Sequence, residues 1–120
     1  MRNARALAVA ILGTALCISA PAVAHTDLTK SIPAADSTVP PPKTIILTFS
    51  EKVAPAFIGV ALTRADGMKN AITTSVSPNG KIVTCTPKGS LAAGTYMLTW
   101  HAASTDDGHR TDGTFSFKVK

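Results

Sequence analysis

Apolar and polar residues alternate with a period of two along most of the chain after residue 43. The clearest runs are residues 44–51 (TIILTFSE), 57–64 (FIGVALTR) and 113–120 (GTFSFKVK). This period places successive side chains on opposite faces, as in strands with one buried face. Asn79-Gly80 is a strong hairpin signal, and no good amphipathic helix follows residue 24. The pattern predicts an all-β fold, an antiparallel β-sandwich or Greek-key barrel of about seven strands.

The run at residues 94–103 (GTYMLTWHAA) predicts which side chains form the core. Alternation places Tyr96, Leu98 and Trp100 on one face, and Met97, Thr99 and His101 on the other. We therefore expect Trp100 to anchor the core. In the strand over residues 81–87, Cys85 shares a face with Val83, and no His-then-Met loop follows it. A packed free thiol is favoured over a blue-copper ligand.

The first 24 residues have the three parts of a secretory signal peptide. Arg2 and Arg5 precede the apolar residues 6–18, and Ala22-Val23-Ala24 is a small-residue cleavage signature. The apolar run is short for a transmembrane helix, which needs about 20 residues. We therefore predict residues 1–24 to be a signal peptide, residues 25–120 to be one domain in the periplasm, and His25 to be its first residue.

Charge and cysteine content exclude several classes of function. Loss of the two arginines before residue 6 lowers the formal charge from +5 to +3. The lysines are scattered and aromatic residues are few, which argues against nucleic-acid binding. Only Cys85 remains in residues 25–120, so no intrachain disulfide can form. No serine lies in a nucleophile motif, which argues against a hydrolase.

A polar loop after residue 103 carries the candidate metal ligands. Asp107 and His109 are two positions apart, so their side chains can point the same way if the segment stays extended, and Gly108 leaves room for an ion. A carboxylate with an imidazole suits Cu(II) or Zn(II) better than calcium. By itself, however, such a motif is most often only a polar turn.

If His25 is the first residue of the exported protein, it favours a metal site over a simple polar turn. Its α-amine and its ring Nδ1 can close a six-membered chelate ring around a metal, which an internal histidine cannot do. The α-amine loses its proton at moderate cost near neutral pH, because its reference pKa is about 8. Nitrogen and oxygen donors from His25, Asp107 and His109 match the tetragonal environment that favours Cu(II).

Four segments together resemble the CopC family of periplasmic copper-binding proteins in bacterial copper resistance. They are HTDLTKSIPAADSTV after the cleavage signature, LTFSEKV, LAAGTYMLTWHAASTDDGH and DGTFSFKV, and the resemblance covers residues 25–120. It implies an immunoglobulin- or cupredoxin-like sandwich that binds one Cu(II) ion and has no enzymatic activity. The implied ligands are His25 as a bidentate donor, Asp107 and His109, with Glu51 in an outer-shell or weak axial role.

The resemblance also implies a partner, a CopD-type copper importer of the inner membrane, and we expect the protein itself to be a monomer. Met68 and Met97 are far apart in the sequence, so we expect no Cu(I) methionine site. His101 stands where the family often has arginine. It is interpreted as a strand-surface residue with a polar partner, or as a hydrogen-bonding group that steadies a ligand.

Two other interpretations remain open at this point. One is a copper-dependent monooxygenase that acts on polysaccharides through an N-terminal histidine chelate. A small domain with few aromatic residues offers little flat surface for a sugar polymer, and Asp107 as a ligand would disfavour oxygen chemistry. The other is a metal-free structural sandwich, which would be favoured if cleavage occurred anywhere other than before His25.

Overall fold

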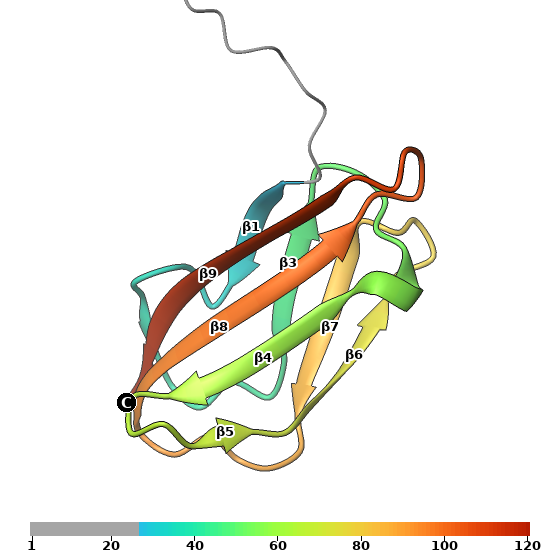
Figure 1. The fold of residues 1–120 in the computed structure, drawn as a ribbon. Coiled ribbons are helices and arrows are strands. Elements are labelled where there is room, and N and C mark those ends of the chain that lie inside the picture. The colour runs from blue at the N-terminus through green and yellow to red at the C-terminus, as the bar shows by residue number, and fades with distance from the viewer. Residues whose placement is uncertain (1–26) are drawn as a thin grey trace, which may run out of the picture.

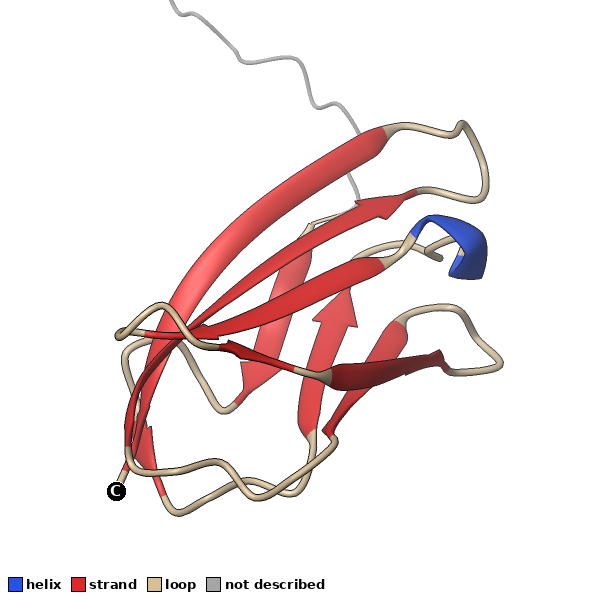
Figure 2. Cartoon of the chain, turned by 60° about the horizontal axis from the view of Figure 1, so that its bottom comes forward, coloured by secondary structure: helices blue, strands red, loops and turns tan. Residues whose placement is uncertain are grey.

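The computed structural model describes residues 27–120, which form two facing β-sheets (Figures 1 and 2). The first sheet has the strand order β1-β3-β7-β6 and the second has the order β2-β9-β8-β4-β5. The strands are β1 (Leu28–Ile32), β2 (Thr38–Val39), β3 (Ile45–Phe49), β4 (Gly59–Arg64), β5 (Lys69–Asn70), β6 (Ile72–Val76), β7 (Ile82–Pro87), β8 (Gly94–Ala103) and β9 (Arg110–Val119).

The predicted all-β sandwich is confirmed. It also contains two short strands, one parallel strand pair and one 3-10 helix. Seven strands in the described part have five or more residues, and the other two have two residues each. All strand pairs are antiparallel except β2 with β9, which is parallel and joins Thr38 to Lys118 and Val39 to Val119. A 3-10 helix, η1 (Pro55–Phe57), connects β3 to β4. No helix within residues 27–120 is long and apolar enough to span a membrane.

The core lies between the sheets and consists of the residues that the period-two pattern places inward. Tyr96, Leu98 and Trp100 are 0%, 0% and 5% exposed, whereas Met97 on the opposite face of β8 is 51% exposed. Trp100 packs edge-on against Phe49 of β3, with ring centroids 5.1 Å apart. The aromatic contact therefore joins the two sheets through residues that alternation alone identifies.

Cys85 is a packed thiol, as predicted. It is fully buried on β7 beside Val83, and burial raises its pKa to about 11. Its register partner on β3 is Ile45, the first residue of that strand, whereas Glu51 follows the last residue. A protonated thiol near the opposite end of the sheet from Glu51 has no part in the candidate site.

The predicted turn at Asn79-Gly80 joins β6 to β7 in an antiparallel hairpin. Gly80 has a φ of +74°, a left-handed conformation that favours glycine. Its carbonyl oxygen accepts a hydrogen bond of 2.8 Å from the amide of Val53. The hairpin thereby holds the segment after β3, which carries Glu51.

Candidate metal centre

The segments that carry the predicted ligands gather at one end of the sandwich. In Figure 1 this end contains the start of β1, the end of β3, and the loop from β8 to β9. The topology produces this arrangement because β1 is antiparallel to β3 and β8 is antiparallel to β9. A strand end and the start of its antiparallel neighbour necessarily lie side by side.

Asp107 and His109 lie in the loop between β8 and β9, as predicted, but the segment between them is a turn. The Asp107 Oδ1 accepts a hydrogen bond of 2.9 Å from the backbone amide of His109. Gly108 has a φ of +69° and donates its amide to the carbonyl of Ser104. The condition that the segment stays extended is therefore not met, because the aspartate side chain and the left-handed glycine together stabilise a tight turn.

The reason for glycine at position 108 is its backbone conformation. A Cβ built there would have no described atom within 4 Å, so close packing against other residues does not explain the glycine. The positive φ does explain the glycine, because residues with a side chain rarely adopt this backbone conformation. Glycine at this position thus has a conformational role, and the room that it would leave for an ion stays a prediction.

The turn also stabilises the ionised form of Asp107. The backbone amide of His109 holds the pKa of the Asp107 carboxyl below its usual value, with further contributions from the Ser104 hydroxyl and the charge of His109. Hydrogen bonds to the ionised form favour that form. The carboxylate therefore loses no proton at neutral pH when a cation arrives.

Ser104 is a positioning residue that sequence reasoning passed over. It is 2% exposed, its Oγ accepts the amide of Asp106 at 3.2 Å, and it donates to Glu51 Oε2 at 3.4 Å. Its amide donates to the carbonyl of His109 at 3.0 Å. One buried hydroxyl thus joins the loop to Glu51. The sequence feature that could have indicated this role is a small polar residue directly after Ala102 and Ala103, the two buried residues at the end of β8.

Glu51 is held at this end by backbone contacts on both sides of it. Thr105 donates its amide to the carbonyl of Lys52 at 3.1 Å, and Val53 forms a bridge with Ser104. The amide of Asp27 donates to Ser50 Oγ at 2.9 Å, and the amide of Ser50 donates to the Asp27 carbonyl at 2.8 Å. The beginning of the described chain is therefore attached next to Glu51.

The described residues bring together part of the predicted ligand set. Glu51, Asp107 and His109 lie at the same end of the sandwich, and His25 lies outside the described residues. No group of three or more His, Cys, Asp or Glu side chains within residues 27–120 is arranged to hold a metal ion. A complete centre at this end therefore requires a further donor.

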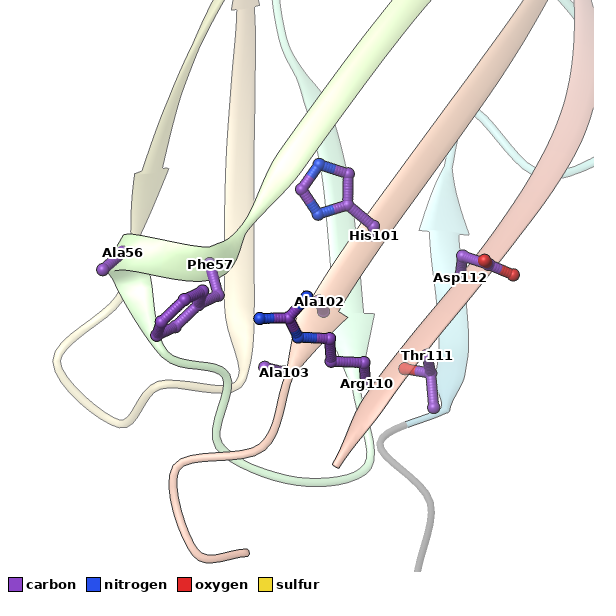
Figure 3. Close-up of a pocket in the computed structure, with 8 residues that line it drawn as sticks. All are labelled: Ala56, Phe57, His101, Ala102, Ala103, Arg110, Thr111 and Asp112. Atoms are coloured by element: carbon purple, nitrogen blue, oxygen red, sulfur yellow. The ribbon is translucent and has the colours of Figure 1, made fainter. Parts of the chain in front are cut away.

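His101 lies away from this loop, on the outer face of the second sheet. It is exposed, and its register partners are Gly59 on β4 and Asp112 on β9. Figure 3 shows its ring over the β4 side of β8, with Asp112 pointing in another direction. The predicted strand-surface position is thus confirmed, whereas the polar partner is not found among the hydrogen bonds and ion pairs of residues 27–120. The ring belongs to a separate hollow.

Fold and site together define a small β-sandwich with an acidic and imidazole-bearing loop at one end. The CopC domain model matches residues 28–120, and the chain belongs to the CopC family. It is 37% identical over 124 residues to copper resistance protein C of Xanthomonas campestris pv. juglandis, covering 97% of each chain. It is 38% identical to copper resistance protein C of Pseudomonas syringae pv. tomato, covering 93% of this chain and 94% of the relative.

Solved structures agree with this assignment. The crystal structure of PcoC, a methionine-rich copper resistance protein from Escherichia coli, matches with a TM-score of 0.74 and 36% identity, covering 81% of this chain and all of PcoC. The structure of CopC from Methylosinus trichosporium OB3b matches with a TM-score of 0.74 and 26% identity, covering 80% and 94%. The family that the sequence resembles is therefore confirmed.

Proposed function

We propose that this chain is an exported periplasmic protein that binds one Cu(II) ion and sequesters, buffers or delivers copper. The observation that carries the proposal is the 37% identity, over nearly the whole of both chains, to a protein named for copper resistance. His25, Asp107 and His109 are the proposed ligands, and Glu51 the outer-shell or weak axial group. The role requires no turnover chemistry.

The geometry of the loop end supports this ligand set. His25 precedes Asp27 by two residues, and two residues of chain span at most about 7 Å. Asp27 is hydrogen-bonded to Ser50, next to Glu51, and Glu51 is joined through Ser104 to the loop of Asp107. A terminal histidine would therefore bring its nitrogen donors to the end of the sandwich that carries Glu51 and the loop of Asp107.

The donor types explain why Cu(II) would be the preferred metal ion. Two imidazoles, one amine and one carboxylate form a nitrogen and oxygen set, and Cu(II) binds such sets more tightly than the other common divalent ions. Asp107 contributes a negative charge, and the hydrogen bond from the His109 amide lowers its pKa further and keeps it ionised in mild acid. A CopD-type membrane importer as the recipient and a monomeric state are parts of the same proposal.

Substitution of Asp107 by asparagine tests the carboxylate. Asparagine keeps a side-chain oxygen that can accept the amide of His109, so the turn is retained while the charge is lost. We expect Asp107→Asn to weaken Cu(II) binding by about tenfold or more, as measured by competition against a chelator of known affinity. Asp106→Asn is the matched control and should stay within about twofold. Equal affinity of the two variants would contradict the assignment.

A further inference from the structure

A second surface feature lies beside the end of β8, on the outside of the second sheet. It is a hollow of about 350 Å³ whose lining includes Phe57, His101 and Arg110 (Figure 3). Three alanines contribute most of the remaining apolar wall. None of these residues belongs to the proposed copper ligands, so the hollow calls for a separate explanation.

Arg110 is held at the hollow by an aromatic ring. Its guanidinium carbon lies 5.6 Å from the centroid of the Phe57 ring, within range of a cation–π contact. Phe57 is itself 52% exposed. The ion pair found within residues 27–120 joins Arg64 to Asp66, so no described carboxylate neutralises Arg110. The planar donors of the guanidinium are therefore oriented and available.

His101 is fixed on the other side of the same hollow. Its ring packs directly over Gly59, where an added Cβ would lie 1.9 Å from Nε2. Glycine at position 59 on β4 leaves the space in which the imidazole lies. Figure 3 shows the guanidinium of Arg110 extending between His101 and Phe57. Asp112 also lines the hollow, with its carboxylate pointing away from the guanidinium in this view.

We propose that the hollow of Phe57, His101 and Arg110 is a docking site for an acidic side chain, flanked by apolar residues, on a partner protein. A guanidinium binds a carboxylate through two parallel hydrogen bonds, and an imidazole adds a donor. The exposed phenylalanine and the alanine walls suit apolar neighbours of that acid. Arginine and aromatic residues are also the types that contribute most energy at protein interfaces.

The position of the docking site connects it to the copper loop. Phe57 and Arg110 also line an adjoining hollow that includes Ser104 and Gly108. A partner bound at the docking site would thus touch the loop that carries Asp107 and His109. The docking site does not depend on the proposed copper function. Its functional link to the loop does, because the partner would lie next to a bound Cu(II) ion only if the loop binds copper.

A peptide titration tests the docking site without copper. The chain beginning at His25 is labelled with ¹⁵N and titrated with acetyl-Leu-Glu-Leu-amide, and with the same peptide carrying glutamine. We expect amide shifts around Phe57, His101 and Arg110 with the glutamate peptide, and none with the glutamine peptide. Arg110→Gln should weaken binding by about tenfold. Asp112→Asn should strengthen it, because a competing negative charge is removed.

Lys118→Gln is the matched control, because it removes one exposed charge at the far end of the same strand. It should change the affinity by less than about twofold. Equal loss in Lys118→Gln and Arg110→Gln, equal binding of both peptides, or no binding would overturn the docking site. Acetate binding as tightly as the peptide would instead identify a small-anion site. All these outcomes are independent of copper affinity, so the two proposals fail separately.

Discussion

Replacement of His109 by alanine is expected to weaken Cu(II) binding by more than about 100-fold, beyond what loss of an outer-shell partner typically costs. Two hydrogen bonds of His109 in the turn use its backbone amide and carbonyl, which alanine retains. The side chain is exposed, so its removal leaves no cavity in the core. The substitution therefore removes an imidazole donor while leaving the backbone groups that form these two hydrogen bonds.

His101→Ala is the matched control for this experiment. It removes an exposed imidazole from the neighbouring strand, at a position outside the loop. Its Cu(II) affinity should remain within about twofold of the unsubstituted chain. Isothermal titration with a competing chelator measures both variants. A similar loss in both would show that copper is held by histidines in general, and would contradict a site built on the β8–β9 loop.

Replacement of Trp100 by alanine is expected to lower the free energy of unfolding by about 3–5 kcal/mol. Trp100 is 5% exposed and contacts Phe49 of the opposite sheet. Gly113 on β9 also packs against it, since a Cβ there would lie 2.7 Å from the indole. Gly113 has no side chain that could fill the space that the indole leaves. Such a loss is a large share of the stability of a domain of this size, about 5–15 kcal/mol.

Met97→Ala provides the comparison on the same strand. Met97 is 51% exposed on the outer face of β8, so its truncation should change stability by less than about 0.5 kcal/mol. Urea unfolding followed by far-ultraviolet circular dichroism measures both variants, because Trp100 is the only tryptophan and fluorescence is lost with it. Comparable effects of the two substitutions would contradict the assigned faces of β8.

The strand faces could be predicted because they depend on a local pattern. In β8, the alternation that places Trp100 inward and Met97 outward is visible in the sequence, and the structure has the same faces. The hairpin at Asn79-Gly80 was equally predictable, because the dipeptide encodes its own turn. By contrast, β1 was not predicted, since a bulge between Leu28 and Lys30 disturbs its pairing with β3.

The candidate site was predictable only in its residue types. Asp107 and His109 could be named from the sequence, but whether the segment is extended or turned depends on a hydrogen bond between them. The contact of Ser104 with Glu51 joins residues 53 positions apart. No local pattern encodes such a contact, because it arises only when β3 and β8 are brought together by the packing of two sheets.

In the proposed site, copper binding depends on a histidine with a free α-amine, and lengthening the chain by one residue removes that amine from the histidine. Cu(II) titration with electron paramagnetic resonance is performed on the chain that starts at His25 and on the same chain preceded by one alanine. If the α-amine is a ligand, the added alanine should weaken binding by orders of magnitude and change the spectrum, since the amine can no longer chelate with Nδ1 of the same residue. Equal affinity and identical spectra for the two chains would contradict the claim.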